Sequence, residues 1–456
     1  MNDNKTYGDN AIIIGGSFAG MVTASVLSKY FKKVTLLERY SQEKVQNHEN
    51  VPQGNHEHHF WHRGSTTLDK LLPGFIDSVT GAGVEVAYFP DDAHIYDEGW
   101  KPKTDRQGTS TLLVSRRLID STVRKLLKNY KNVTTLYDIE VTGLLNNFKE
   151  KKIIGVEFVN KATNEKSNLY ADLVVDATGY DSIGPSWLES LGYEKPAKTE
   201  IKSNVYALTR YFHIPDSAKP KWKMLKVKGK NPRIAAGGQV ENVPQGAQWS
   251  FIITTESGDK FNFSNPEEEF MEVARNLEDP TAYQFFQSGV PLTKVYTFRY
   301  PANRRYHYES ARNLPGAFLA MGDALFTTNP RQVNGLTNAV LSCEVLDQCL
   351  KENKAKNLKE VIPSFFQNVV PVRDQIWNLA IGDSLRYPAT EGKRPFAFKF
   401  KIWYFRSILH LANDDPDVWL TLWRVIRFES DFKSLFQPSI LGKVLLKAIK
   451  DPFIKK

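Results

Sequence analysis

Residues 11–39 constrain the fold more than any other segment, because an apolar strand, a tight glycine turn, a helix and a second strand follow one another without interruption. The segment reads AIIIGGSFAGMVTASVLSKYFKKVTLLER, and Gly15, Ser17 and Gly20 occupy the positions of a G-x-G-x-x-G pattern with serine in the middle. Gly15 lets the turn tighten, the small Ser17 lets a pyrophosphate approach, and Gly20 lets helix and strand pack closely. The helix N-terminus then offers unpaired N–H groups and a positive dipole end to that pyrophosphate.

An acidic residue completes this segment. Glu38 closes the second strand, eighteen residues after Gly20, where such folds bond the ribose hydroxyls of an adenine nucleotide. A carboxylate there disfavours a 2′-phosphate, so the segment predicts FAD or NAD rather than NADP. The alternative, a glycine turn that serves only packing, is disfavoured because the strand, the helix and Glu38 are all in place.

Two later segments predict further strands of the same buried sheet. LYADLVVDATG (169–179) and GAFLAMGDA (316–324) are short, nearly continuous apolar runs that end in Gly or Asp. That pattern is typical of parallel strands covered on both faces. Helical periodicity follows the first and the last of the three strands, and we expect helices at 21–31 and 334–350.

The segment 201–308 has a different texture. NVYALTRYFHI, QWSFIITTE and KVYTFRY are rich in β-branched and aromatic residues between Gly, Pro and Asn clusters, which predicts an antiparallel sheet. We therefore predict an α/β fold: an FAD/NAD(P)-binding, three-layer Rossmann-like domain, an inserted antiparallel-sheet substrate domain and a helical C-terminal region. The expected boundaries are 1–200 and 309–375 for the two parts of the dinucleotide-binding domain, 201–308 for the inserted sheet and 376–456 for a C-terminal helical cap.

Composition and cysteine spacing bear on the cellular setting. No run of eighteen apolar residues occurs, and the polar N-terminus MNDNKTYGDN lacks an apolar signal core. We therefore expect no membrane-spanning helix and a cytoplasmic location. Cys343 and Cys349 lie six residues apart in one expected helix, on different faces, so we expect two reduced thiols rather than a disulfide or a pair of metal ligands.

The C-terminal segment 393–456 is basic and aromatic. It carries thirteen Lys/Arg against six Asp/Glu and includes FAFKFKIWYF and VWLTLWRVIRF. One interpretation is a surface for a membrane or a nucleic acid. We favour an amphipathic helical cap whose lysine stems cover apolar surface, because apolar positions recur at helical spacing and no nucleic-acid module is present. Nucleic acid is therefore not expected as a partner, and peripheral membrane contact through 393–456 stays open.

Asp323 stands at the C-terminal end of the strand FLAMGD, the edge where open α/β sheets place their ligands. Its carboxylate could accept hydrogen bonds from a sugar or polyol chain, and the alternative is a helix cap. A helix N-terminus near Asn334 would stabilise negative charge on a bound ring system.

The stretch HEHHFWH (56–62) holds four of the nine histidines. A metal site needs ligands at fixed spacing together with a further ligand from elsewhere, and this stretch alone does not supply that set. No metal is therefore expected.

Several motifs in one order give the chain a family resemblance. It resembles the FAD-dependent monooxygenases of the aromatic hydroxylase type, and within them a bacterial subgroup of FAD-binding or polyprenyl-methoxyphenol hydroxylase-like proteins. The motifs extend over nearly the whole chain and are GGSFAG, VPQGNHEHHFWHRGSTTLDKLLPGF, Ser115-Arg116, DLVVDATGYDSIGPSWLESLGY, YPANRRYHYE, MGDALFTTNP and GDSLRYPATEG.

The resemblance implies FAD bound in an extended form. Its pyrophosphate would meet residues 17–20, its adenosine ribose Glu38 and its ribityl chain Asp323. Arg116 matches the flavin-contacting arginine of the family, the alternative being a surface helix arginine. His56 and His58 fall where the subgroup also has histidine, and His58 is expected as a polar wall of the flavin or substrate cavity or as a hydrogen-bonded loop residue. The full set of expected cofactor-binding residues is Gly15, Gly16, Ser17, Phe18, Ala19, Gly20, Glu38, Arg39, His58, Arg116, Gly322, Asp323, Asn334 and Gly335.

The chain departs from the subgroup at three positions near this expected site. Val333 replaces a glycine where backbone should approach the flavin ring, Tyr180 replaces a common arginine after DATG, and Asn55 replaces an arginine before His56. The Trp-x-Trp-x-Ile-Pro motif of flavin-dependent halogenases is absent from the sequence.

The resemblance implies a monooxygenase that uses NAD(P)H and O2 and acts through a flavin hydroperoxide. We expect it to hydroxylate or epoxidise an apolar aromatic or polyene molecule bound between flavin and the inserted sheet, and no catalytic residue is named. Arg210, Tyr211 and Trp249 are weak substrate-binding candidates, each as compatible with packing or surface. The alternatives are a flavoprotein reductase or cyclase acting on a prenyl or polyene substrate, and a non-catalytic flavin-binding protein.

Overall fold

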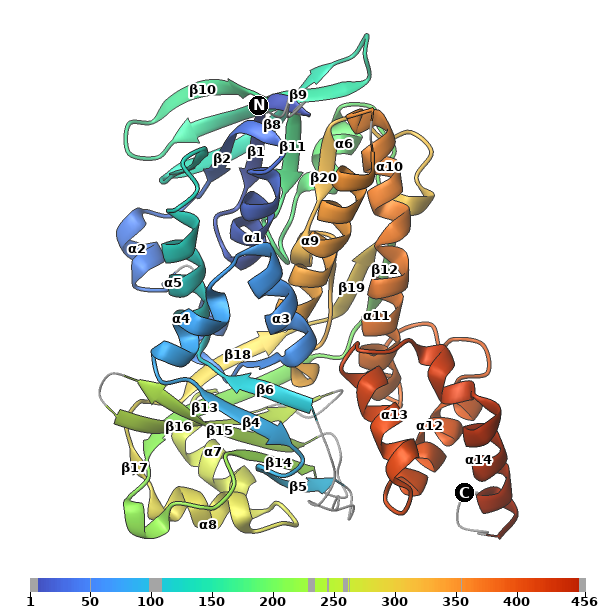
Figure 1. Cartoon of the computed structure of the whole chain (residues 1–456). Coiled ribbons are helices and arrows are strands. Elements are labelled where there is room, and N and C mark those ends of the chain that lie inside the picture. Colours follow the sequence, from blue (N-terminus) through green and yellow to red (C-terminus); the bar gives the residue numbers. More distant parts are fainter. Residues whose placement is uncertain are drawn as a thin grey trace.

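The computed structural model describes residues 7–49, 51–97, 109–228, 234–243, 246–256, 261, 263–353 and 355–450. It has an upper body, a large sheet below it and a group of C-terminal helices beside that sheet (Figure 1). The MNDNKT residues of the polar N-terminus, on which the cytoplasmic prediction partly depends, lie outside the described residues. That prediction stays a prediction.

A five-stranded parallel sheet forms the centre of the upper body. Its order is β20 (Phe318–Ala320), β11 (Leu173–Asp176), β1 (Gly8–Ile14), β2 (Phe31–Leu37) and β7 (Val133–Leu136). The three strands expected from the sequence are neighbours at the centre and one edge of this sheet. All of β11 and β20 is buried, which explains why their sequences are continuous apolar runs rather than alternating ones.

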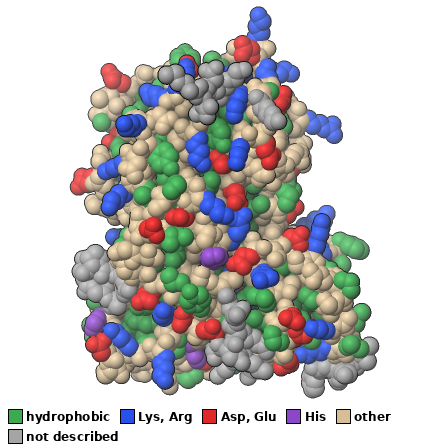
Figure 2. Space-filling model, viewed as in Figure 1, with side chains coloured by type: hydrophobic (Ala, Val, Ile, Leu, Met, Phe, Trp, Pro, Cys, Tyr) green, Lys and Arg blue, Asp and Glu red, His purple; other side chains and the backbone are tan. Residues whose placement is uncertain are grey.

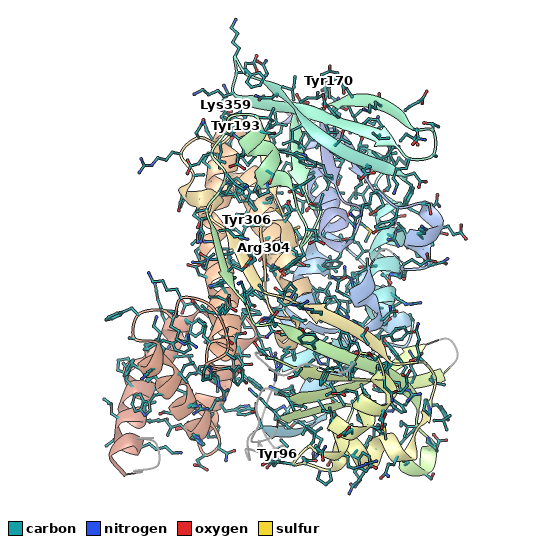
Figure 3. The ribbon with its side chains drawn as sticks, turned by 180° about the vertical axis from the view of Figure 1, so that it is seen from behind. Tyr96, Tyr170, Tyr193, Arg304, Tyr306 and Lys359 are labelled. Carbon is teal, nitrogen blue, oxygen red and sulfur yellow. The ribbon has the colours of Figure 1, made fainter. Side chains whose placement is uncertain are left out.

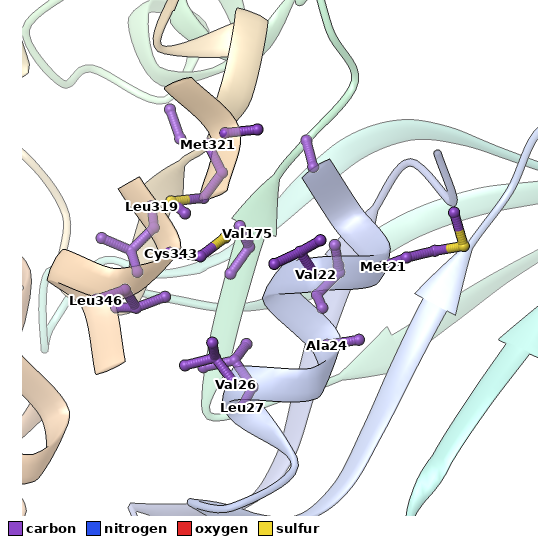
Figure 4. Packing of buried hydrophobic residues seen from close by; sticks show 14 of the residues in the cluster. Met21, Val22, Ala24, Val26, Leu27, Val175, Leu319, Met321, Cys343 and Leu346 are labelled. Carbon is purple, nitrogen blue, oxygen red and sulfur yellow. The ribbon is translucent and has the colours of Figure 1, made fainter. Parts of the chain in front are cut away.

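Helices cover one face of the parallel sheet and an antiparallel layer lies at the other. Helix α1 (Phe18–Leu27) packs between the sheet and α9 (Gly335–Glu352). Figure 4 shows Val22 and Val26 of α1 facing Cys343 and Leu346 of α9, with Leu319 and Met321 close by. The opposite layer is the meander β8 (Ile139–Asn147), β9 (Lys152–Asn160) and β10 (Glu165–Tyr170). Both cysteines are buried and free, as expected.

The first helix differs from its expected range of 21–31. It begins at Phe18, directly after the glycine turn, and ends at Leu27. The next residues form a short turn in which the Tyr30 N–H bonds to the Leu27 carbonyl oxygen at 2.9 Å. Phe31 already starts β2, because the chain must reverse within four residues to place β2 beside β1.

The large sheet has seven strands and crosses below the upper body (Figure 1). Its strands pair antiparallel, except that β14 pairs with β5 in parallel. Helices α7 (Pro266–Arg275) and α8 (Thr281–Ser288) contribute to the hydrophobic cluster on one of its faces. The strands are β17 (Val290–Pro291), β13 (Val205–His213), β16 (Gly246–Thr255), β15 (Ala235–Val243), β14 (Met224–Lys228) and β5 (Ala93–Asp97), with β18 (Tyr296–Tyr300) also on β13.

One strand of this sheet comes from outside the segment 201–308. Strand β5 precedes that segment in the chain and forms an edge of the sheet. The predicted domain boundaries stay a proposal. Residues 93–97 would then belong to the domain of the large sheet although they precede residue 201.

The C-terminal region is helical, as expected. Helices α12 (Phe398–Ala412), α13 (Pro416–Ile426) and α14 (Pro438–Lys450) share a hydrophobic cluster with Ala87 and Phe89 of β4 (Glu85–Phe89), which lies beside the large sheet. On the face in Figure 2, basic and acidic side chains are interspersed. Phe396, Phe400 and Leu446 are exposed, and membrane contact through this segment stays a prediction. None of the helices in the described ranges combines the length and apolarity needed to cross a bilayer.

The remaining elements connect these three parts. The helices are α2 (Gln42–Gln46), α3 (His62–Leu71), α4 (Phe75–Gly81), α5 (Arg116–Leu127), α6 (Gly184–Ser190), α10 (Leu358–Asn368) and α11 (Val370–Ser384). The short strands are β3 (His59–Trp61), β6 (Thr109–Leu113) and β4 (Glu85–Phe89) in one sheet, and β12 (Lys198–Ile201), β19 (Asn303–Tyr306) and β21 (Phe326–Thr327) in another.

Candidate functional site

One cavity of about 2160 Å³ is lined by residues of all three parts of the molecule. We call its upper part the dinucleotide groove and define it by Gly15, Ser17, Glu38, Arg116 and Asp323. We call the part against the C-terminal helices the aromatic end and define it by Trp61, Phe89, Trp423 and Arg427. All of these residues line the cavity.

Neighbouring backbone atoms leave no room for a side chain at Gly15 or at Gly20. Gly15 has φ +107°, and a Cβ added to it would lie 2.4 Å from the carbonyl oxygen of Ala177. A Cβ on Gly20 would lie 1.9 Å from the carbonyl oxygen of Gly15. The structure therefore places both glycines where only glycine fits, and α1 starts directly at the cavity wall.

The N-terminus of α1 opens onto the groove. Ser17 is its N-cap and makes no side-chain capping bond, and Ser17, Phe18 and Ala19 line the cavity. The first N–H groups of a helix lack intrahelical partners, so this end can hold an anion. Gly16 and Gly20 do not appear among the lining residues and support the turn from behind.

Glu38 is tied to the glycine turn. It is 4% exposed, and its Oε2 accepts the Gly16 N–H at 3.1 Å while its Oε1 accepts the Tyr40 N–H at 3.0 Å. Burial raises the pKa of Glu38, and these two bonds oppose that rise. Its neighbour Arg39 also lines the cavity and donates to the Tyr40 hydroxyl at 3.0 Å.

Arg116 lines the cavity, and its side chain is largely buried. It is the first residue of α5, after the N-cap Ser115. Its Nε donates to Asp120 Oδ1 at 2.8 Å, and its guanidinium carbon lies 5.5 Å from the Phe18 ring centroid. The carboxylate thus fixes the guanidinium from behind, on the cavity side of the fold.

Gly322 and Asp323 reach the groove from the other end of the sequence. Gly322 has φ +58°, and a Cβ there would lie 2.7 Å from the Ala19 Cβ, so the two loops touch. Burial raises the pKa of Asp323 to about 6, and the Arg116 charge and a bond with Thr327 oppose the rise. The cation and the carboxylate therefore act on one another across the groove.

In the loop before α9, the backbone at Val333 has a conformation that glycine normally adopts. Val333 has φ +52°, a left-handed conformation that strains a β-branched residue. Val333 and Gly335 line the cavity, whereas Asn334 is the buried N-cap of α9 and does not appear among the lining residues. The start of α9 is thereby directed at the cavity.

The four clustered histidines have separate partners. His56 Nδ1 lies 2.7 Å from Thr209 Oγ1, and His58 Nδ1 donates to the His56 carbonyl oxygen at 2.8 Å. His59 Nε2 lies 2.8 Å from Glu57 Oε1, and His62 contacts Ser110. Burial lowers the pKa of His56 to about 4. Burial, aided by the Arg116 charge, lowers the pKa of His58 to about 3. Nowhere in the described ranges do three potential ligands gather as a metal site would require.

A buried polar cluster missed by the sequence reasoning supports the histidine loop. Gln239 Nε2 donates to the His58 carbonyl oxygen at 2.8 Å and to Glu241 Oε1 at 3.0 Å, and Ser250 donates to the same carboxylate. Burial raises the pKa of Glu241 to about 7. Gln239 and Glu241 lie two residues apart on one face of β15. Nothing in a single sequence indicates that this face lies beside the histidine loop.

Arg304 of β19 contacts Tyr180, the residue that replaces a common arginine of the subgroup that the chain resembles. Its guanidinium carbon lies 4.0 Å from the Tyr180 ring centroid, and the Tyr180 and Tyr300 centroids are 5.6 Å apart. Figure 3 shows Arg304 and Tyr306 between the upper body and the large sheet. Asn55, the third departure, accepts a hydrogen bond from Arg117 at 2.9 Å.

The three weak substrate candidates lie outside the cavity lining. Trp249 packs in the core of the large sheet, with ring centroids 5.3 Å from Trp222 and 5.0 Å from Phe285. Arg210 donates to the Thr293 carbonyl oxygen at 2.9 Å, and Tyr211 is buried. The cavity face of the sheet instead carries Ala207, Gly237, Ile252 and Thr254. Strand alternation is the signal that separates Ile252 and Thr254 from Trp249.

Comparisons with known proteins identify one similar sequence and several similar folds. No family model matches the chain. Protein Rv3254 of Mycobacterium tuberculosis is 26% identical over 459 residues, covering 96% of this chain and 93% of the relative.

Three solved structures have a similar fold. A flavoprotein/dehydrogenase from Cytophaga hutchinsonii has a TM-score of 0.63 at 19% identity, covering 95% of this chain and 96% of that one. The flavin-dependent brominase Bmp2 has 0.63 at 12%, covering 92% and 93%. PqsL of Pseudomonas aeruginosa, classed with the FAD-dependent monooxygenases, has 0.58 at 15%, covering 83% and 96%. The chain therefore has the fold of FAD-dependent monooxygenases and halogenases, which confirms the predicted fold class.

Proposed function

We propose that this protein is an FAD-dependent monooxygenase that uses NAD(P)H and O2 to hydroxylate or epoxidise an apolar aromatic or polyene molecule. The observation that carries the proposal is the convergence of the glycine turn, Glu38, Arg116 and Asp323 on one groove. Two of these groups are separated by about 300 residues in sequence, and their loops touch at Gly322 and Ala19.

The residues present fit FAD in an extended form. The start of α1 offers free N–H groups to the pyrophosphate, and Arg116 adds a guanidinium whose planar fork suits phosphate oxygens. Glu38 would accept from the adenosine ribose and Asp323 from the ribityl chain. Asp323 gains from this arrangement, because hydroxyl donors would stabilise a carboxylate that burial otherwise disfavours.

Bound FAD would supply the redox chemistry, while the chain positions the cofactor, stabilises its charge and excludes water. The N-terminus of α9, directed at the cavity behind Val333 and Gly335, would stabilise negative charge on the cofactor ring. His58 stays neutral at physiological pH, with its Nδ1 proton held by the His56 carbonyl oxygen. It thereby presents an uncharged polar edge to the cavity.

The large sheet supplies an apolar wall opposite these groups. Ala207, Gly237, Ile252 and Phe298 line the cavity there. Such a surface excludes water and buries an apolar substrate. PqsL has been solved with 2-aminobenzoylacetate bound, at a TM-score of 0.59, which supports a small aromatic molecule as substrate for a protein of this fold.

Oxygen use separates this proposal from the reductase and cyclase alternatives. FAD-loaded protein is mixed with NADH or NADPH and with aromatic or polyene compounds, and oxygen and nicotinamide consumption are recorded together. We expect a substrate-stimulated, matched consumption of both, and incorporation of isotopically labelled O2 into the product. Product formed equally well without oxygen would contradict the monooxygenase and favour a reductase or cyclase.

A further inference from the structure

The aromatic end of the cavity contains a buried arginine. Arg427 follows the last residue of α13 and is 7% exposed. Its guanidinium carbon lies 3.1 Å from the Trp61 ring centroid, 4.9 Å from that of Trp423 and 5.3 Å from that of Phe89. Rings attract a cation through their faces, so they hold the guanidinium in place while its in-plane N–H groups stay open to an acceptor.

Arg427 has no anionic partner among the described residues. Neither a hydrogen bond nor an ion pair involves its side chain there, and its Nε is buried without an acceptor. The acidic residue that acts on it electrostatically, Glu429, is exposed to solvent. A buried cation is normally paired or hydrogen-bonded, because desolvation without a partner is costly.

The other buried cations of the cavity wall do have partners. Arg331 Nη1 lies 2.7 Å from Glu256 Oε2, and Lys228 Nζ lies 3.1 Å from Asp383 Oδ1. The described part of the chain therefore supplies a carboxylate to each of these two buried lining cations and none to Arg427.

A second cation lies close to Arg427. Lys226 of β14 lines the cavity with a half-exposed side chain, and the Arg427 charge acts on it. Lys226 has a loose partner in Asp97, at 3.7 Å between Nζ and Oδ2. The carboxylate at this end therefore pairs with Lys226 and not with Arg427, which leaves the Arg427 charge for a ligand anion to neutralise.

We propose that the aromatic end binds the carboxylate of an aromatic acid, with Arg427 as the anion anchor and Trp61, Phe89 and Trp423 as the walls around the ring. A planar fork of N–H groups matches a carboxylate in two-point geometry, and aromatic walls match a flat ring. Strand β3 connects this end to the histidine loop, because His59 and Trp61 lie on one face with ring centroids 5.6 Å apart. The inference rests on the proposed function for turnover, and it narrows the substrate class to aromatic acids.

Calorimetric titration with a matched pair of probes tests the anchor. The purified protein, with its flavin content recorded, is titrated with 2-naphthoate and with the neutral 2-naphthamide in a low-chloride buffer at pH 7. We expect at least about tenfold tighter binding of the acid, the effect of one charge-assisted contact. Arg427→Met should remove this preference and leave naphthamide binding within about threefold.

The control is Arg424→Met, the same exchange at an exposed arginine of α13, which should keep the preference. Equal binding of the two probes to the unaltered protein would overturn the proposal, and so would an acid preference that survives in Arg427→Met. If that variant does not fold, the comparison of the two probes on the unaltered protein still decides. A protein that binds the acid selectively yet takes up no FAD would refute the proposed function and leave the anion site standing.

Discussion

The dinucleotide groove and the aromatic end belong to one cavity, yet they offer opposite kinds of surface. The groove is made largely of backbone: a glycine turn that admits no Cβ, the start of a helix, and the Glu38 carboxylate held by two N–H groups. The aromatic end is made of side chains from β3, β4 and α13, around a cation without a partner. A surface made of backbone suits a cofactor that is the same in every protein of this fold. A surface made of side chains can differ between such proteins through substitution, and so can suit a particular substrate.

The largest effect is expected at the backbone end, from Gly15→Ala. The added Cβ would lie 2.4 Å from a backbone oxygen, so the turn must open. We expect a loss of about 4 kcal/mol or more in the free energy of unfolding and the loss of FAD binding. Gly192→Ala is the matched control, since Gly192 also has positive φ but no atom within 4 Å of the added Cβ, and it should cost about 1–2 kcal/mol. Similar urea midpoints for the two variants would contradict this account of the groove.

The next effect compares two buried arginines. Arg331→Met leaves Glu256, which is 0% exposed, as an unpaired buried carboxylate, and should lower the free energy of unfolding by about 3 kcal/mol. Arg427→Met removes a cation that has no partner, and burial already lowers the pKa of that arginine to about 9. The lost ring contacts and the saved desolvation oppose one another, so we expect no change or a gain of up to about 2 kcal/mol. Chemical denaturation measures both, and a large loss in Arg427→Met would show that its charge is balanced within the chain.

A pH effect is expected from Asp323. Burial raises the pKa of this carboxyl to about 6, so the folded, cofactor-free protein holds a proton that the unfolded chain has released. The contribution of this carboxyl to stability is therefore fully present below the unfolded pKa of about 4 and is lost as the pH rises through about 6, a decline of about 2–3 kcal/mol. Asp323→Asn should flatten this part of the curve. Identical pH dependence of the urea midpoint in the two proteins would mean that Asp323 is not desolvated in the groove.

The smallest effect is expected from Val333→Gly. The valine holds a left-handed backbone at φ +52°, which costs a β-branched residue about 1–3 kcal/mol, while glycine loses part of that gain through the entropy of the unfolded chain. We expect a net gain of about 1 kcal/mol, measured as a higher denaturation midpoint. An unchanged or lower midpoint would indicate that the Val333 side chain contributes packing that outweighs the strain.

The two ends also differ in how far the sequence reveals them. Gly15, Gly20 and Glu38 lie within one short segment, and their spacing is fixed by local geometry, so the groove could be predicted together with the parallel sheet. Asp323 could be chosen from its place at the end of an apolar strand, whereas Arg116 needed the family resemblance, because nothing local in the sequence shows that its loop lies beside the glycine turn.

The aromatic end could not be predicted, because its parts converge only through long-range packing. Trp61, Phe89 and Arg427 belong to three segments, and each alone is as compatible with an ordinary core. Trp249, a weak substrate candidate, shows the same limit: the sequence places it on a strand of the sheet but does not show which face meets the cavity, and the alternation of β16 places Ile252 and Thr254 there instead.

The FAD content of the purified chain tests the central claim most directly. The protein is incubated with excess FAD, passed through gel filtration and examined by its visible absorption spectrum, with Gly15→Ala treated in parallel. The account predicts a yellow protein that retains one FAD per chain and a variant that retains none. A folded, colourless protein that takes up no FAD would contradict it.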